Sequence, residues 1–311
     1  MLGRALHSVK PGLRAVAQQL SRPLSVAAAA AVTADQKPTI YTSPRPNVTI
    51  PKQDLYSFIF DPSLSKHAHR TASVDGVTGE QYSFAELQAK VDALAAGLTK
   101  LGLKKDDVVG IFAPNHIEFG VVFLATARLG AVLTTANPTY TAEELKFQLE
   151  DTKAKFLVTL PELLPTAVEA AKGTAVQALY VLGPNEVSGK AKTVTSLFSS
   201  ASSLPKIPEF DPAQQDIVLP YSSGTTGQPK GTQLTHTNLV ANMLQHHDIL
   251  YTANNIDPLN ESNICTLPLY HIYGMTVLLN SYRMRQKLVY CGVCSTRFLS
   301  LIRYFPAAAQ V

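Results

Sequence analysis

The 311-residue sequence contains no tryptophan and only three cysteines, and charged residues make up just 16% of it. Three cysteines are too few for a disulfide framework. Cys291 and Cys294 form one C-x-x-C pair, but no second pair accompanies it, and a structural zinc site of this kind needs four ligands. We therefore interpret these cysteines as small buried residues in a strand. The hydrophobic content of 46% is ordinary for a protein with a sizeable core.

Long apolar runs are also missing from the sequence. The best candidate for a membrane span, residues 117–133, contains Glu118 and Arg128. It is also shorter than the roughly 20 residues that a bilayer requires. We predict a buried helix there and no transmembrane span.

The globular part lacks an excess of positive charge. Four of the 27 basic residues precede Asp35, the first acid, and the remaining 23 match the 23 acids. Without a basic patch, nothing indicates nucleic-acid binding. The four early basic residues accompany serines and apolar residues at helical spacing, a pattern typical of a mitochondrial transit peptide over residues 1–34. A disordered tail with chance periodicity is the alternative. Residues 35–54 are rich in Pro and Thr, which indicates a linker or an extended arm.

From residue 55 onward, predicted strands alternate with predicted helices. Capping boxes at Ser83 with Glu86 and at Thr141 with Glu144 predict the starts of two helices. Short apolar runs predict strands at 108–112, 131–134, 155–159 and 178–182. Residues 183–212 are rich in Ser, Lys and Pro, and we expect surface loop with one short helix there. This alternation predicts an α/β fold with a largely parallel sheet.

The most informative segment reads YSSGTTGQPKG and follows a predicted strand at 217–219. Its two glycines allow positive φ and close approach of the backbone to a ligand. Successive amides can then point into one concavity that binds anions, while the hydroxyls and the lysine add further donors and charge. We expect it to bind polyphosphate through Ser222, Ser223, Gly224, Thr225, Thr226, Gly227 and Lys230.

Two alternatives to this interpretation follow from the same residues. Composition alone favours a flexible Ser/Gly/Thr loop between two strands. A Walker P-loop is excluded, because its G-x-x-x-x-G-K-[ST] spacing is absent. The order of the residues favours a phosphate-binding loop over a flexible one, because a ten-residue string is far more specific than a single G-x-G.

In that order, residues 222–231 resemble the signature phosphate loop of the adenylate-forming (AMP-binding) superfamily. This superfamily includes acyl-CoA synthetases, nonribosomal-peptide adenylation domains and firefly luciferase, and the likeness is strongest to 4-coumarate–CoA ligase and luciferase-like acyl-CoA ligases. Residues 135–141 resemble the A-N-P-x-Y-T segment of the family, and residues 267–274 resemble its L-P-x-x-H-x-x-G segment. The resemblance covers roughly residues 50–290.

The resemblance implies the N-terminal large domain of the adenylate-forming fold, an α/β domain of stacked mixed sheets with packed helices, over residues 55–311. It also implies that a carboxylic acid reacts with ATP to give an acyl-adenylate, from which the thiol of coenzyme A displaces AMP. The phosphate loop would hold the β- and γ-phosphates, with Mg²⁺ near Thr225 or Thr226. His271, Tyr273 and Gly274 would lie beside the acyl group. For His271, a satisfied core histidine is the alternative.

The sequence also departs from the family. The later Y-G-x-T-E and T-G-D motifs do not occur in these 311 residues, and the usual glycine falls at Arg285 or Gln286. We expect the C-terminal small domain to be absent from this chain. We therefore expect an incomplete AMP-binding domain without a complete catalytic set, with weak nucleotide binding and little turnover. A non-catalytic nucleotide- or acyl-binding paralog and a luciferase-like oxygenase are the alternatives.

Several properties stay open at this stage. The acid can be aromatic or a medium-chain fatty acid, and the oligomeric state is unknown. The N-terminal pattern favours mitochondria over peroxisomes or cytoplasm.

Overall fold

The computed structural model describes residues 42–43, 45–200, 203–222 and 229–290. By its internal contacts the chain divides into two units, 1–47 and 48–311, and all described helices and strands belong to the second. The predictions for the leader at 1–34 and for Cys291 and Cys294 fall outside the described residues.

The larger of two sheets has eight strands, six of them parallel. They are β3 (Val108–Phe112), β4 (Val132–Ala136), β5 (Phe156–Thr159), β6 (Ala178–Val181), β7 (Lys192–Thr193), β8 (Asp216–Ser222), β9 (Lys230–Gly231) and β10 (Leu234–Thr235). The order is β10-β8-β4-β3-β5-β6-β7, and β9 and β10 pair antiparallel with β8. The predicted α/β fold with a largely parallel sheet is confirmed.

The smaller sheet joins distant parts of the chain. Its strands are β1 (Thr71–Asp75), β2 (Gln81–Ser83), β11 (Ser262–Cys265) and β12 (Lys287–Tyr290). Their order is β11-β12-β1-β2, in which β11, β12 and β1 are parallel and β2 is antiparallel. The sheet therefore forms only when residues near 75 meet residues near 290.

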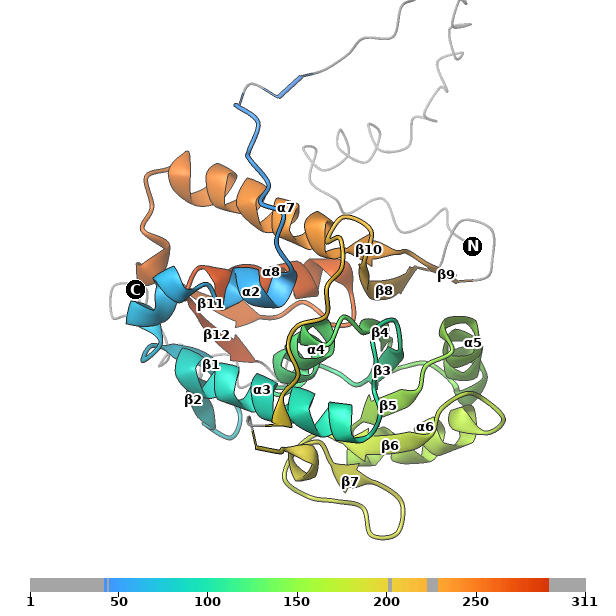
Figure 1. Cartoon of the computed structure of the whole chain (residues 1–311). Helices are drawn as coiled ribbons and strands as arrows, with labels where there is room; N and C mark the ends of the chain where they lie inside the picture. Colours follow the sequence, from blue (N-terminus) through green and yellow to red (C-terminus); the bar gives the residue numbers. More distant parts are fainter. Residues whose placement is uncertain (1–41, 44, 201–202, 223–228, 291–311) are drawn as a thin grey trace, which may run out of the picture. The chain divides into compact units, whose positions relative to one another are not determined.

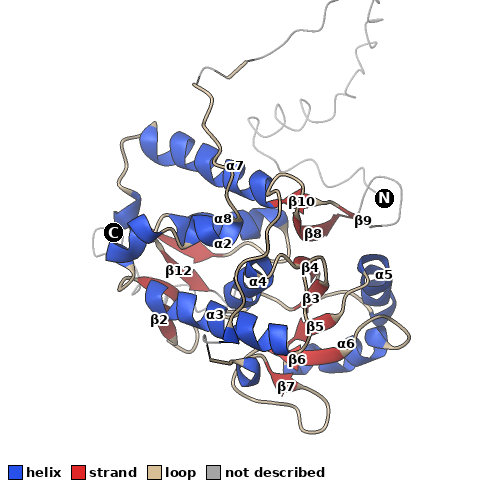
Figure 2. Cartoon of the chain, viewed as in Figure 1, coloured by secondary structure: helices blue, strands red, loops and turns tan. Residues whose placement is uncertain are grey.

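Helices cover both faces of the larger sheet (Figure 2). The α-helices are α2 (Leu55–Ile59), α3 (Phe84–Lys100), α4 (Phe119–Arg128), α5 (Ala142–Thr152), α6 (Leu164–Ala171), α7 (His236–His247) and α8 (Ile272–Arg283). Short 3₁₀ turns lie at Pro62–His67, Pro161–Leu163, Thr195–Leu197 and Pro258–Asn260, and a π turn at Asp248–Thr252. Both predicted capping boxes are confirmed, because at each helix start the two side chains accept each other's backbone amide.

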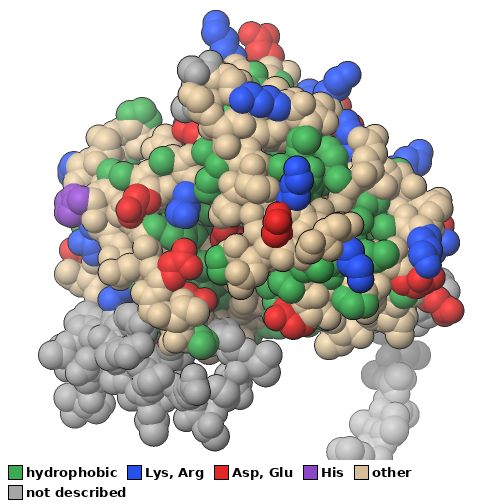
Figure 3. All heavy atoms as spheres, turned by 90° about the horizontal axis from the view of Figure 1, so that it is seen from below, with side chains coloured by type: hydrophobic (Ala, Val, Ile, Leu, Met, Phe, Trp, Pro, Cys, Tyr) green, Lys and Arg blue, Asp and Glu red, His purple; other side chains and the backbone are tan. Residues whose placement is uncertain are grey.

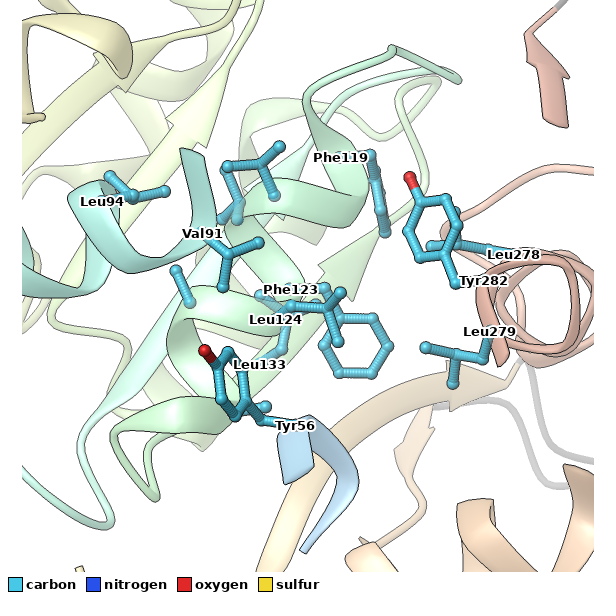
Figure 4. Packing of buried hydrophobic residues seen from close by; sticks show 14 of the residues in the cluster. Tyr56, Val91, Leu94, Phe119, Phe123, Leu124, Leu133, Leu278, Leu279 and Tyr282 are labelled. Atoms are coloured by element: carbon cyan, nitrogen blue, oxygen red, sulfur yellow. The ribbon is translucent and has the colours of Figure 1, made fainter. Parts of the chain in front are cut away.

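One large core connects the two sheets. It contains buried side chains from α2, α3, α4, α7 and α8 and from strands of both sheets. Figure 4 shows Val91 and Leu94 of α3, Phe119 and Phe123 of α4, and Leu278 and Tyr282 of α8 within it. A second cluster lies where α5 and α6 pack on the large sheet. The predicted buried helix within 117–133 is confirmed as α4, whose residues from Phe119 to Ala127 are all buried.

The prediction for residues 183–212 was partly wrong. β7 extends the large sheet by pairing parallel with β6, and the following Val194 is buried. The turn after it packs tightly on α3, since a Cβ on Gly97 would lie 1.8 Å from the Leu197 carbonyl oxygen. A two-residue strand is too short to show an alternating apolar pattern. It can therefore be recognised only from its pairing with a neighbouring strand.

Arg285 is one of the two positions at which the resemblance implies a glycine. It follows α8 with φ of 57°, a left-handed conformation in which glycine avoids the steric cost that a side chain pays. Its side chain is nevertheless buried, with the guanidinium 4.7 Å from the centre of the Phe84 ring. This contact offsets part of the backbone strain.

The helices and the surface charges agree with the near balance of acids and bases and the lack of long apolar runs in the sequence. None of the described helices is long and apolar enough to cross a membrane. On the face that Figure 3 presents, acidic and basic side chains are interspersed and not separated by sign.

Candidate functional site

Strands β3, β4 and β8 end at the same edge of the large sheet. The parallel register places Thr135 of β4 beside Ile111 of β3 on one side and beside Pro220 of β8 on the other. In open α/β sheets, ligands bind outside the carboxyl ends of such strands. The segment at 135–141 and the predicted phosphate loop therefore emerge next to one another.

The two ends of the predicted phosphate loop are held together. Ser222 pairs with Lys230, and Tyr221 pairs with Gly231, as an antiparallel stem. The amide of Thr232 also donates to the Pro220 carbonyl at 2.9 Å. Ser222 and Lys230 are both exposed, so their side chains are accessible to a ligand. Ser223, Gly224, Thr225, Thr226 and Gly227 lie outside the described residues, and their predicted roles, including Mg²⁺ near Thr225 or Thr226, stay predictions.

Tyr221 fixes this stem to the neighbouring helix. Its hydroxyl donates to the Asp151 carboxylate of α5, while its ring covers Gly231, where an added Cβ would lie 3.0 Å from ring carbons. Burial and the adjacent carboxylate both raise the pKa of Tyr221, so the phenol stays protonated and remains a donor. No pattern in the sequence around Tyr221 indicates this role.

Buried polar groups tie β4 to β8 and α5 just below this edge. The Thr134 hydroxyl donates to the Leu219 carbonyl at 3.0 Å, and the Gln148 amide donates to the Thr134 hydroxyl at 2.8 Å and to the Thr135 carbonyl at 3.1 Å. Buried hydrogen bonds of this kind give the strand ends one defined position.

The segment at 267–274 reaches the same edge. The Thr135 hydroxyl donates to the Tyr270 carbonyl at 2.7 Å, so two of the family-like segments are in direct contact. His271 is the N-cap of α8, where its ring accepts a hydrogen bond from the Tyr273 amide at 3.3 Å. His271 is exposed, which contradicts the alternative of a core histidine. Tyr273 is 61% exposed.

Gly274 has a steric reason to be glycine. A Cβ at this position would lie 2.1 Å from the Pro268 carbonyl oxygen, far inside van der Waals contact. The first turn of α8 therefore packs directly on the backbone of the preceding segment, which fixes where His271 and Tyr273 project.

Asn115 is a further residue of this edge, which no motif in the sequence indicates. It follows β3 at the same edge, and its side-chain amide donates to the carbonyls of Cys265 at 3.1 Å and Leu267 at 2.9 Å. Its side-chain oxygen accepts from the Leu269 amide at 2.8 Å. One side chain thus satisfies three backbone groups of the segment that leads to His271. The only signal in the sequence was a polar residue three positions after the end of a buried strand.

Metal-binding clusters are absent from the described part of the chain, where no three His, Cys, Asp or Glu side chains gather. Mg²⁺ in phosphate sites keeps several waters and uses only one or two protein carboxylates together with the phosphates.

Comparison with known proteins agrees with this geometry. Residues 60–304 match the family of AMP-binding enzymes. The 4-coumarate–CoA ligase 5 of Oryza sativa is 34% identical over 244 residues, 77% of this chain and 43% of that protein. A long-chain fatty-acid–CoA ligase from Archaeoglobus fulgidus superposes with a TM-score of 0.72 at 25% identity, over 85% of this chain and 52% of the other. ATP-bound MatB from Rhodopseudomonas palustris gives a TM-score of 0.66 at 26% identity, over 80% and 47%.

The chain belongs to the AMP-binding enzyme family, and its fold is that of the N-terminal domain of adenylate-forming enzymes. The predicted likeness to 4-coumarate–CoA ligases is confirmed. The chain spans less than half the length of the curated relatives that it matches.

Proposed function

We propose that this chain forms the ATP- and acid-binding part of an acid–CoA ligase. The observation that carries the proposal is the contact between family-like segments at one sheet edge, where the stem of the phosphate loop lies beside β4 and Thr135 holds the segment that carries His271. The likeness to 4-coumarate–CoA ligases supports the ligase activity, and the family match and ATP-bound MatB support the use of ATP.

In the first step, a carboxylate oxygen attacks the α-phosphorus of ATP, and the bond from that phosphorus to the β-phosphate oxygen breaks. The products are an acyl-adenylate and pyrophosphate. Residues 222–230 would contact the leaving pyrophosphate, where Lys230 and the backbone amides would favour the charge that develops on it. Bound Mg²⁺ would supply further shielding of phosphate charge.

In the second step, the thiol of coenzyme A attacks the acyl carbon and AMP leaves, which gives the thioester. His271, Tyr273 and Gly274 would border the acyl group, because the start of α8 projects them from the clamped segment. Asn115 and Thr135 would act as positioning residues through their hydrogen bonds to that segment. The acid class is proposed as aromatic or medium-chain aliphatic.

A binding experiment tests the proposal directly. Mg²⁺–ATP is titrated into the 311-residue chain by calorimetry, followed by 4-coumarate, benzoate and octanoate in the presence of a non-hydrolysable ATP analogue. We expect Lys230→Ala to weaken ATP binding by about tenfold, which corresponds to ~1.4 kcal/mol. Pyrophosphate release with each acid is measured in parallel.

Lys100→Ala is the matched control, because Lys100 is also exposed but ends α3 away from the carboxyl edge of the sheet. The control should bind ATP as the unmodified chain does. Equal ATP affinities for the Lys230 and Lys100 variants would refute the assignment of the phosphate loop.

We also propose that residues 1–34 direct the protein to mitochondria, on the strength of their basic, acid-free, amphipathic pattern. A fluorescent protein fused to these residues should collect in mitochondria. A version with Arg4 and Arg14 replaced by Glu should stay dispersed, and an unchanged distribution would contradict the proposal.

A further inference from the structure

A histidine and a buried carboxylate meet where β3 leads into α4. His116 lies four positions after the end of β3, and Glu118 is the N-cap residue of α4. The Nδ1 atom of His116 accepts a hydrogen bond from the Glu118 backbone amide at 3.2 Å and lies 3.8 Å from Oε2 of the Glu118 carboxylate. Glu118 is only 9% exposed. One ring nitrogen therefore accepts a backbone bond and also lies near a buried acid.

The same carboxylate holds the start of the loop that follows β6. Its Oε2 atom accepts a hydrogen bond from the Gly183 amide at 2.7 Å. Gly183 lies two positions after the end of β6 and has φ of 88°. Because β5 separates β3 from β6 in the large sheet, the Glu118 side chain reaches across the end of β5. The imidazole lies close to this loop as well, since a Cβ on Gly183 would lie 3.9 Å from Nε2 of His116.

The titratable groups around His116 come from several elements. Desolvation of the partly buried ring lowers the pKa of His116 below its ordinary value of 6.5, and nearby carboxylates oppose this shift. These carboxylates lie at the start of α4, at the end of β1, just before β2 and in the 3₁₀ turn after β5, and belong to Glu118, Asp75, Glu80 and Glu162. The phenol of Tyr82 in β2 donates to the Ile117 carbonyl and also interacts with Glu118.

The hydrogen bonds of the neutral ring determine where a second proton binds. Because Nδ1 of His116 accepts the bond from the Glu118 amide, the neutral ring carries its proton on Nε2. A second proton therefore binds at Nδ1 and turns that atom into a donor. The bond from the Glu118 amide is then lost, while the carboxylate oxygen 3.8 Å away can accept from the charged ring. A charge-assisted bond of this kind is stronger than the neutral amide bond from Gly183.

We propose that His116 and Glu118 form a pH-sensitive switch that holds the loop after β6 at neutral pH and releases it in acid. In the neutral form, the Glu118 carboxylate binds the Gly183 amide. In the acid form, it pairs with the His116 imidazolium, and the Gly183 amide is left to water. The change falls between about pH 6.5, where an ordinary histidine titrates, and about pH 4.3, where an ordinary glutamate becomes neutral. The switch does not depend on ligase activity.

The test follows the Gly183 amide by NMR in the full 311-residue chain. Labelling with ¹⁵N-glycine limits the spectrum to the 17 glycines. The Gly183 signal is the one missing from Gly183→Asn, because asparagine tolerates positive φ and the added Cβ has room. Between pH 7 and pH 5, we expect protection of this amide against solvent exchange, corrected for the intrinsic effect of pH, to fall about tenfold as its hydrogen bond is lost.

Two variants each remove one half of the switch. His116→Asn can still accept the bond from the Glu118 amide through its side-chain oxygen, but it does not titrate. Glu118→Gln still accepts from the Gly183 amide, but it has no charge to attract an imidazolium. Both variants should keep the Gly183 amide protected down to pH 5. His69→Asn is the matched control, because it removes an exposed histidine before β1 and should respond to pH as the unmodified chain does.

The other glycine signals in the same spectra report any general loss of stability. Circular dichroism and thermal melting at both pH values establish that each variant is folded, and if one of the His116 and Glu118 variants unfolds, the other decides the outcome. Loss of protection in the unmodified chain and the His69 variant alone supports the switch. A Gly183 amide that stays protected in the unmodified chain at pH 5, or that loses protection equally in all three variants, overturns the proposal.

Discussion

The edge of the large sheet exposes its polar side chains, whereas the junction between the two sheets buries them. Ser222, Lys230 and His271 are exposed and are held by the hairpin stem and by helix capping. At the junction, the Tyr282 hydroxyl lies 2.9 Å from the Ser73 hydroxyl and 2.8 Å from that of Tyr290, all fully buried. Burial raises the pKa of Tyr282 to about 12, so these phenols stay neutral. We infer that the buried junction fixes how the two sheets pack together. Side chains at the exposed edge can then be replaced at little cost in stability.

The largest effect should come from the junction. In Gly120→Ala, the new methyl group on α4 would lie 2.6 Å from the Tyr282 hydroxyl, inside a packed core. We expect a loss of about 3 kcal/mol in the free energy of unfolding, measured by urea denaturation. Gly189→Ala is the control, since nothing lies within 4 Å of its added Cβ and only its positive φ costs about 1 kcal/mol. Equal losses would show that the junction is not tightly packed.

Asn115 links the two regions, because it lies between the core and the exposed edge. Asn115→Leu removes three hydrogen bonds to the 265–269 segment. We expect a loss of about 2 kcal/mol in stability. Acid binding should weaken while ATP binding changes little, as measured by calorimetry.

Gln215→Leu provides the matched control for Asn115. Gln215 is a buried amide at the opposite edge, where it donates to Asp106 at 2.7 Å and to the Gly130 carbonyl at 3.1 Å. It should lose similar stability without weakening acid binding. If both variants weaken acid binding equally, Asn115 is merely structural.

His236 should make stability depend on pH. Its Nδ1 accepts from the Leu55 amide at 3.0 Å, and burial lowers its pKa from 6.5 to about 4. Above pH 6.5 the ring is neutral in both the folded and unfolded states. As the pH falls from 6.5 to 4, the unfolded state gains a proton that the folded state excludes, so stability falls by at most ~3 kcal/mol.

His236→Gln tests this dependence, because glutamine can still accept a hydrogen bond but does not titrate. Urea denaturation between pH 7 and pH 4 should show a shallower loss for the variant than for the unmodified chain. Identical slopes would mean that other groups cause the acid sensitivity.

The smallest effect should come from the edge. Tyr221→Phe removes the partly exposed hydrogen bond to Asp151, and we expect a loss of about 0.5 kcal/mol. Tyr56→Phe is the comparison, because its hydroxyl donates to Asp92 at 2.6 Å from a nearly buried ring and should cost more. A larger loss at Tyr221 than at Tyr56 would reverse the distinction between edge and core.

Local signals were enough to predict many elements of the fold. Capping boxes act within four residues, so Ser83 and Thr141 located α3 and α5 correctly. Apolar runs located the central strands for the same reason. β7 was missed because its partner β6 defines it, whereas the short helix expected within 183–212 is present as the 3₁₀ turn at Thr195–Leu197.

The candidate site likewise has features that a short segment predicts and features that depend on residues far apart in the sequence. The order of residues at 222–231 identified the family, because that information lies within one short segment. The role of Asn115 could not be read from its neighbours, since its partners lie about 150 residues away. The contact of Tyr221 with Asp151 spans 70 residues. Such pairings follow from how the strands assemble, which a single sequence does not display.

The small sheet has a consequence for biosynthesis. β1 needs β12 as its parallel neighbour, and some 215 residues separate Asp75 from Tyr290. At typical ribosomal speeds this delay is roughly 10–40 s. Throughout that interval the edge of β1 that will receive β12 has no partner and is exposed to other chains. Nascent protein should therefore depend on chaperones during translation more than its finished fold suggests.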